Sequence, residues 1–157
     1  MKNLISKLLL FIPILWIGCD SIEDQKGRFL LKGNKKMEEN DPKTALEFYK
    51  EAIALDSNFS DAYYNKGMAH LRLNQLEEAI QDFTKAIQKK PETIDAVFQR
   101  GLAYLDLGAN YNAKVEASRM VSESPTDWRS YFLVGLTEEK LKNYPAALQS
   151  FQKASEL

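Results

Sequence analysis

Histidine and cysteine, the two residue types that most often perform chemistry, occur once each in this sequence, as His70 and Cys19. A single histidine excludes most histidine-based metal sites and catalytic triads, and a single cysteine excludes an intramolecular disulfide. The sequence also contains no glycine-rich phosphate loop, no Gly-x-Ser-x-Gly nucleophile elbow and no HExxH or CxxC motif. We therefore expect neither enzymatic activity nor a bound cofactor or metal.

Adjacent carboxylates are the remaining candidates for acid–base chemistry. They occur at Glu38-Glu39, Glu77-Glu78 and Glu138-Glu139. Successive residues of a helix do not face each other, and charge pairs of this kind usually belong to a solvated surface. We expect these glutamates to be solvated, and we expect His70, which falls on a core register, to pack between helices.

The overall composition is that of a globular protein with one domain and a short tail. Apolar residues make up 45% of the 157 residues, which excludes wholesale disorder. The 21 Lys and Arg residues nearly balance the 22 Asp and Glu residues, and the longest basic runs are two lysine pairs. Because nucleic acids are bound by clustered basic charge, we expect no nucleic-acid partner.

The first 18 residues differ from the rest of the chain. They contain two lysines, no acidic residue and an apolar run from Leu8 to Ile17. That run is about half of the roughly 20 residues that cross a bilayer as a helix. A basic start and a short apolar stretch are typical of a secretory signal peptide, so we expect residues 1–18 to be removed on export. An uncleaved segment that acts as a short anchor is the alternative.

Cys19 follows this segment directly. The sequence from Leu15 to Cys19 resembles the lipobox of bacterial lipoproteins, in which a signal peptidase cuts before a cysteine that is then acylated. The resemblance implies an exported protein with lipid on Cys19 and a membrane-anchored spacer over residues 19–25. Asp20 resembles an inner-membrane retention signal, whereas the acidic stretch 20–24 resembles a surface-export signal. We favour the outer membrane over the inner membrane.

Small residues recur along the remaining chain at a period of 34. The recurrent glycines are Gly33, Gly67, Gly101 and Gly135. The recurrent alanines are Ala45, Ala79, Ala113 and Ala147. Self-similarity at a period of this length is the signature of a repeat protein. Because small side chains let two helix axes approach closely, the pattern predicts tightly packed helix pairs.

Each unit of 34 residues also has the pattern of two helices. In residues 60–93 a first apolar stripe ends before Asn74, which favours a left-handed turn, and a second stripe ends at Pro91. One such pair cannot bury enough apolar surface to be stable alone, whereas four stacked pairs form a continuous core. We therefore predict an all-α solenoid of eight helices with a concave face.

The period and its residues resemble the tetratricopeptide repeat (TPR) family. In that family a unit carries Gly at position 8, Ala at 20, an aromatic residue at 24 and Ala at 27. The matching units of this chain are residues 26–59, 60–93, 94–127 and 128–157. The resemblance implies four stacked helix-turn-helix repeats, wound as a right-handed superhelix over residues 26–157.

Two departures from the family pattern predict local adjustments. The third unit has Ala117 in place of the aromatic residue and Met120 in place of Ala, so we expect the flexible methionine to fill the space. Position 7, commonly Leu in the family, is Lys32 in the first unit, Lys66 in the second and Arg100 in the third. We expect their aliphatic stems to pack while their charges reach water.

In the TPR family, ligands bind on the inner face formed by the first helix of each pair. The residues that match groove positions are Leu30, Asn34, Tyr64, Asn65, Met68, Phe98, Gln99, Leu102, Phe132 and Leu136. The resemblance implies that a peptide or a segment of a partner protein binds along them. Phe98 lies at the middle of the aromatic line, so we expect Phe98→Ala to weaken partner binding while lowering the free energy of unfolding by less than about 2 kcal/mol. The alternative is that part of this line is ordinary packing between repeats.

One subclass of the family binds the C-terminal carboxylates of heat-shock chaperones through two asparagines and three basic residues. Asn34 and Asn65 match the asparagines, but Leu30, Asp95 and Gln99 replace the basic residues. Without cations the carboxylate of such a ligand would be desolvated and unpaired, so we expect no chaperone clamp.

The sequence as a whole predicts a lipid-anchored TPR scaffold for protein partners at a bacterial envelope membrane. Assembly of an envelope complex is one role that fits such a scaffold. The alternative function is a solenoid that binds an envelope glycan or another small ligand without a protein client. A glycan site requires exposed aromatic platforms, and Trp128 is the only tryptophan after residue 18.

Overall fold

The computed structural model describes residues 21–157, so the predicted signal peptide and Cys19 lie outside the described residues. The described part of the chain consists of eight helices and contains no strand, which confirms the predicted all-α fold. The helices are α1 (Ile22–Glu38), α2 (Pro42–Leu55), α3 (Ser60–Arg72), α4 (Leu76–Lys89), α5 (Ile94–Asp106), α6 (Asn110–Glu123), α7 (Trp128–Lys140) and α8 (Tyr144–Ser155).

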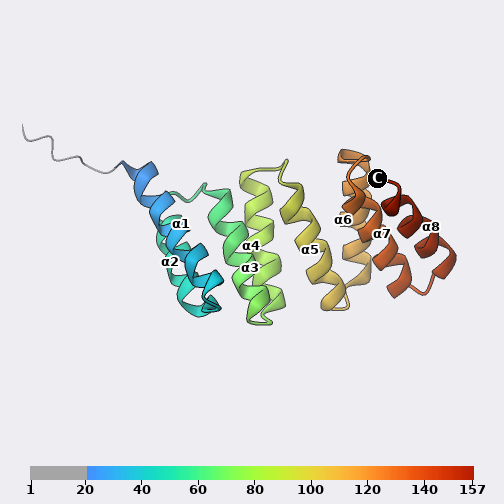
Figure 1. Ribbon diagram of the computed structural model, residues 1–157, viewed down its shortest axis with the longest axis horizontal. Coiled ribbons are helices and arrows are strands. Elements are labelled where there is room, and N and C mark those ends of the chain that lie inside the picture. The colour runs from blue at the N-terminus through green and yellow to red at the C-terminus, as the bar shows by residue number, and fades with distance from the viewer. Residues whose placement is uncertain (1–20) are drawn as a thin grey trace, which may run out of the picture.

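The helices form an elongated solenoid. Figure 1 shows them in chain order from one end of the molecule to the other. Each helix packs mainly on the helices before and after it, and further contacts join α1 to α3 and α5 to α7. Helices α1 and α3 therefore lie side by side, and so do α5 and α7. Over residues 21–157, no helix has the length and apolarity required to cross a bilayer.

Helix α1 begins before the first predicted repeat. Ser21 caps it, since the Ser21 hydroxyl accepts a bond from the backbone N–H of Asp24 and the Asp24 carboxylate accepts one from the backbone of Ser21. Residues 22–25, which the sequence assigned to a spacer, are therefore helical. Only Asp20 and Ser21 separate Cys19 from the first helix.

A left-handed residue ends the first helix of every pair. These residues are Asn40, Asn74, Gly108 and Lys142, with φ between 56° and 79°. The next backbone N–H donates to the carbonyl five residues earlier at 2.8–2.9 Å, which satisfies the last turn of the helix. The predicted turn at Asn74 is confirmed. Lys142 is the least suited of the four, because Gly has no Cβ and the short polar side chain of Asn tolerates this conformation, whereas the long side chain of Lys offers no such compensation.

The recurrent glycines allow an aromatic ring of the second helix to pack directly against the backbone of the first helix. A Cβ on Gly33 would lie 2.4 Å from the Tyr49 ring, and a Cβ on Gly67 would lie 2.7 Å from the Phe83 ring. Tyr49 and Phe83 are almost completely buried. The predicted reason for the small residues is therefore confirmed in these two pairs.

The third pair fills this space differently. A Cβ on Gly101 would lie 2.5 Å from Leu133, which belongs to α7 of the following repeat. Met120 and Ala117 are buried, but the side chain that takes the place of the missing ring is Leu133. Met120 is fully buried, which agrees with its expected role as a filler, and Leu133 of the next repeat supplies further volume beside Gly101.

Lys32 is exposed as expected, whereas the charged groups of Lys66 and Arg100 pair with carboxylates instead of lying in water. Lys66 Nζ lies 2.7 Å from Asp82, and Arg100 Nη2 lies 2.8 Å from Glu116. Both carboxylates are buried on the second helix of the same pair. Burial raises the pKa of Asp82, although its bond with Lys66 opposes that effect. These ion pairs therefore join the two helices of the central repeats.

Glu138 is buried, although it was expected to be solvated. The other five glutamates of the adjacent pairs are exposed, as expected. Its carboxylate lies 2.8 Å from Lys114 Nζ and accepts a bond of 2.8 Å from Asn143 Nδ2. These two contacts lower the pKa of Glu138. His70 packs between helices as expected, with Nε2 3.4 Å from Asp82.

Candidate functional site

The predicted groove residues lie on the four first helices, and the structure divides them by exposure. Nine are half-buried: Leu30, Asn34, Tyr64, Asn65, Met68, Gln99, Leu102, Phe132 and Leu136. The tenth, Phe98, is only 9% exposed and belongs to the hydrophobic core. The burial of Phe98 favours the alternative, in which this part of the aromatic line is packing between repeats.

Four of these residues line one pocket between α1 and α3. The pocket has a volume of about 330 Å³ and is lined by Asn34, Met37, Glu38, Tyr49, Tyr64, Asn65 and Met68. Sequence reasoning did not assign Tyr49 or Glu38 to the site. Tyr49 occupies the core aromatic register of the second helix, so only the structure shows that it also reaches the groove side of α1.

The two asparagines are bonded to each other rather than separately solvated. Asn65 Nδ2 donates to Asn34 Oδ1 at 3.0 Å, and the Tyr49 hydroxyl donates to the same oxygen at 2.9 Å. Burial raises the pKa of Tyr49 to about 12, so its hydroxyl keeps the donated proton at neutral pH. Among residues 21–157, no partner occupies Asn34 Nδ2 or Asn65 Oδ1. The pair therefore offers the amide N–H groups of Asn34 and the amide oxygen of Asn65 to a ligand.

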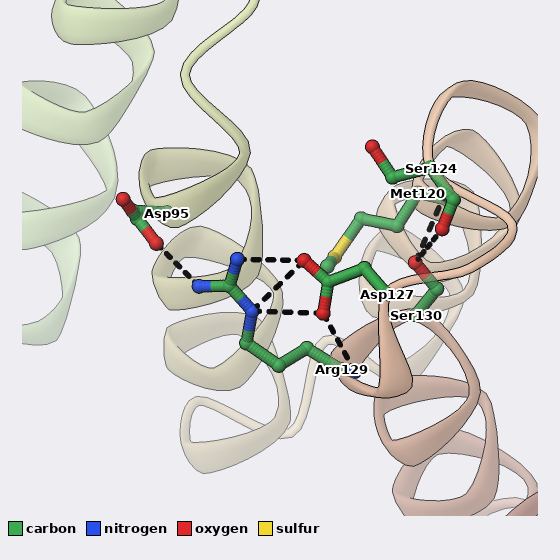
Figure 2. Close-up of polar contacts among 6 residues, drawn as sticks. All are labelled: Asp95, Met120, Ser124, Asp127, Arg129 and Ser130. Carbon is green, nitrogen blue, oxygen red and sulfur yellow. Dashed lines mark hydrogen bonds and ion pairs between the residues drawn. The ribbon is translucent and has the colours of Figure 1, made fainter. Parts of the chain in front are cut away.

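Arg129 covers another part of the inner face, between α5 and α7. Its guanidinium carbon lies 5.9 Å from the centre of the Phe98 ring. Figure 2 shows the guanidinium bonded on one side to Asp127 and on the other to Asp95. The Arg129–Asp127 bond measures 2.6 Å, and this contact lowers the pKa of Asp127. Phe98 is therefore covered by a charged side chain from the next repeat.

The start of α7 is fixed to the end of α6 by Ser130. Its hydroxyl lies 2.8 Å from the carbonyl oxygen of Ser124 and 3.1 Å from that of Met120 (Figure 2). The Met120 carbonyl also accepts from the backbone N–H of Ser124, and the Ser124 carbonyl accepts from that of Asp127, so the Ser130 hydroxyl is a further donor at a connection that is already bonded. The position of Arg129 over Phe98 is therefore part of the connection between the third and fourth repeats.

Trp128 is the most prominent aromatic residue beside this connection. It is 49% exposed, and its ring meets Phe132 edge-on at 5.7 Å between centroids. Phe132 in turn lies 5.8 Å from Phe151 of α8. Phe132 is thus held between two rings, and Trp128 presents the open surface. No group of His, Cys, Asp and Glu residues in the described part of the chain is arranged to hold a metal ion.

These features define an α-solenoid of repeated helix pairs with a pocket on its inner face. Models of the tetratricopeptide repeat match residues 60–92 and 129–157, and a further TPR model matches residues 33–74. Together the matches cover more than half of the chain. The chain belongs to the tetratricopeptide-repeat family.

Solved structures of TPR proteins resemble this solenoid. MamA is 28% identical, with a TM-score of 0.77 over 87% of this chain and 78% of that one. YrrB, described as a TPR protein with an unusual peptide-binding site, is 26% identical, with a TM-score of 0.70 over 82% of this chain and 66% of that one. No curated protein sequence matches this chain significantly.

A third solved structure contains a bound peptide. The second TPR of Spaghetti (RPAP3), bound to the HSP90 peptide SRMEEVD, is 28% identical to this chain. The TM-score is 0.62 over 65% of this chain and 94% of that one. The similar structures are thus scaffolds of repeated helices, and two of them are described with peptide sites or ligands.

Proposed function

We propose that this protein is an interaction scaffold that binds an extended segment of a partner protein in the pocket between α1 and α3. The unused amide donor of Asn34 and acceptor of Asn65 are the observation that carries this proposal. An extended peptide exposes backbone N–H and C=O groups that require such partners when they leave water. Tyr64 and Met68 line the same pocket and offer apolar surface to a side chain.

The pocket is held in a binding-ready arrangement by the chain itself. Asn34 is fixed by bonds to Tyr49 on α2 and to Asn65 on α3. A ligand therefore does not need to order these side chains, which reduces the entropic cost of binding. The descriptions of YrrB and of the Spaghetti domain as peptide-binding proteins support the same use here.

The partner differs from a chaperone tail. In this chain Leu30, Asp95 and Gln99 stand where a carboxylate clamp has basic residues. Glu38 lines the pocket instead. We expect no measurable binding of an acidic peptide such as SRMEEVD, because its carboxylates would lose water without gaining a cation.

The experiment that tests the pocket compares two neighbouring repeats. Asn65→Ala removes the free amide acceptor, whereas Gln99→Ala changes the equivalent position one repeat later, outside the pocket. Partners should be co-purified from membranes in mild detergent with each variant. We expect Asn65→Ala to weaken capture of the specific partner about 10-fold, as loss of one or two hydrogen bonds would, and Gln99→Ala to leave it unchanged. Equal capture by both variants would exclude this pocket.

The location proposed for this scaffold is a bacterial envelope membrane, with the outer membrane favoured. The lipobox-like sequence before Cys19 supports export and lipidation. Because two residues separate Cys19 from α1, a lipid there would hold the pocket of the first two repeats near the bilayer. We expect Cys19→Ala to abolish acyl-chain labelling and to release the protein into the soluble fraction. Labelling that persists in this variant would contradict the assignment.

A glycan site is the second candidate function, and the exposed ring of Trp128 favours it. Aromatic faces of this kind stack on sugar rings, and Asp127 lies beside it in the chain. Retention of the protein on immobilised envelope polysaccharide, lost in Trp128→Ala and kept in Asn65→Ala, would support this function over the peptide scaffold.

A further inference from the structure

We propose that α8 binds α8 of a second copy of this chain, so that two solenoids join at their α8 ends about a two-fold axis. Figure 1 shows α8 at one end of the solenoid and α1 at the other. The surface of α8 is therefore remote from the pocket between α1 and α3. In the described part of the chain, α8 packs mainly against α7. Another side of α8 carries the residues that point to a second copy.

A stripe of mainly apolar residues runs along α8 and is exposed to water. Its residues recur at helical spacing and share one side of the helix; they are Tyr144, Leu148, Phe151 and Ser155. Tyr144 is 63% exposed and Leu148 is 60% exposed. Phe151 is half-buried, since its ring packs on Gly135 of α7. The α8 stripe thus presents two large apolar side chains that no helix of residues 21–157 covers.

The same side of the second helix is covered in earlier repeats. Leu46 on α2 and Lys114 on α6 hold the register of Leu148. Leu46 is only 8% exposed and shares a buried cluster with Ala69 of α3. Lys114 pairs with Glu138 of α7. This side of a second helix therefore faces the first helix of the next repeat, and in the described chain α8 has no such neighbour.

The surroundings of the α8 stripe are free of charge. Residues 144–152 contain no Asp, Glu, Lys or Arg. The equivalent residues 42–50, 76–84 and 110–118 contain three, three and two such residues. The centres of protein interfaces are depleted of charged residues and enriched in aromatic ones. Two copies of α8 can therefore meet along this stripe without burying an unpaired charge.

The α1 end of another copy does not fit the α8 stripe. Two positions of each later first helix meet the preceding second helix, as Ser130 does by its bond to the Met120 carbonyl and Ala69 does in the buried cluster with α2. The residues at these positions are small and buried: Ala62, Ala69, Ala96, Ala103, Ser130 and Thr137. Helix α1 has Arg28 and Lys35 there, and both are exposed. Stacking α1 on α8 would bury two cations against an uncharged surface, which disfavours a head-to-tail chain of copies.

An antiparallel pairing makes the α8 stripe complementary to itself. With the two-fold axis between residues 149 and 150, Leu148 of one copy faces Phe151 of the other, and Tyr144 faces Ser155. The Ser155 hydroxyl donates its proton to the Gln152 carbonyl, so its oxygen is able to accept from the Tyr144 hydroxyl of the second copy. Each contact occurs twice, as a two-fold axis requires. One helix of 12 residues per copy gives a small interface, so we expect a weak dimer with a dissociation constant of about 10–100 µM.

The test is sedimentation equilibrium of the full-length protein, in a detergent whose density matches that of the solvent. We expect monomers at about 1 µM and mainly dimers at about 500 µM. Leu148→Glu should weaken the dimer about 10-fold or more, because pairing would bury two carboxylates without cations. Val115→Glu is the matched control and should leave the dimer unchanged, since Val115 is an exposed apolar residue of α6 outside the α8 stripe.

A second pair of variants tests the antiparallel arrangement. Tyr144→Lys should also weaken the dimer about 10-fold, because it removes an exposed ring from the interface. Adding Ser155→Glu to this variant should strengthen the dimer again by about threefold or more, since two Lys–Glu pairs form across the axis. The two positions lie roughly 16 Å apart along one helix, so they cannot pair within a copy.

Four results would overturn the proposal. The first is a protein that stays monomeric at about 500 µM, which would leave the α8 stripe to a different protein. The second is a dimer that Leu148→Glu does not weaken. The third is a series of assemblies that grow with concentration, as head-to-tail stacking would produce, and the fourth is a double variant that gains nothing from Ser155→Glu. Thermal melts at about 1 µM should be the same with and without Leu148→Glu, so that loss of the dimer is distinguished from unfolding.

Discussion

Tyr64 on α3 and Phe98 on α5 hold the same repeat position, 34 residues apart, but they have different surroundings. Between α1 and α3, amide groups and Tyr64 surround a pocket that is open to a ligand. Between α5 and α7, Phe98 is buried and Arg129 lies over it, bonded to Asp95 and Asp127. A repeat position therefore does not determine a role by itself. The side chain that the following repeat places over it decides whether it is exposed.

The largest expected effect concerns Phe98, which Arg129 covers between α5 and α7. Phe98→Ala should lower the free energy of unfolding by about 3–5 kcal/mol, because it removes a buried ring from the main core. Gln99→Ala is the control and should change it by less than about 0.5 kcal/mol. Urea denaturation measures both. A Phe98→Ala variant of normal stability that no longer captures the partner would restore Phe98 as a ligand anchor.

A smaller effect on stability is expected when Gly67 or Gly101 is replaced by alanine, and the two replacements should differ. Gly67→Ala should cost about 1–3 kcal/mol, because the new Cβ meets the enclosed Phe83 ring. Gly101→Ala should cost less, since the Leu133 side chain that it meets is more flexible than a ring. Gly27→Ala is the control, with nothing within 4 Å, and should stabilise α1 by up to about 1 kcal/mol. A greater loss of thermal stability in Gly101→Ala than in Gly67→Ala would contradict this account of the third repeat.

The acid dependence of stability should differ between Glu138 and Asp82. The pKa of Glu138 is lowered in the folded protein. Its ionised carboxylate therefore contributes to the free energy of unfolding above about pH 4.5, and this contribution is lost as the pH falls through the folded pKa. The pKa of Asp82 is raised, so its protonation on acidification favours folding. Denaturation midpoints measured from pH 6 to 3 should fall less steeply in Glu138→Gln and more steeply in Asp82→Asn. The opposite order would show that the assigned contacts are wrong.

The smallest expected effect concerns the left-handed turn of the fourth repeat. Lys142→Gly should stabilise the protein by about 0.5–1 kcal/mol, because φ is 63° at a residue with a Cβ. Lys85→Gly, inside α4, is the control and should destabilise by about 1 kcal/mol. If both substitutions destabilise the protein equally in chemical denaturation, the turn at Lys142 carries no strain.

The sequence was sufficient to predict the repeat fold, because period and helix pattern both depend on residues that recur within each unit. Tyr64 and Phe98 share one position, and their different exposure depends on Arg129 from the next unit, which the repeat pattern does not specify. Glu138 was assigned to the surface for a similar reason, since Lys114 and Asn143 reach it from other positions. Residues that differ from the repeat pattern also contact one another, and the pattern cannot predict those contacts. Only the structure shows them.

Site-specific photo-crosslinking in cells is the most direct test of whether a partner binds at the first two repeats rather than at the last two. A benzophenone side chain would be placed at Met68, which lines the pocket, and separately at Leu136, which holds the same position in the fourth repeat. We predict a crosslink to a partner protein from position 68 and none from position 136. A partner crosslinked from position 136 and absent from position 68 would contradict the assignment of the binding site to the first two repeats.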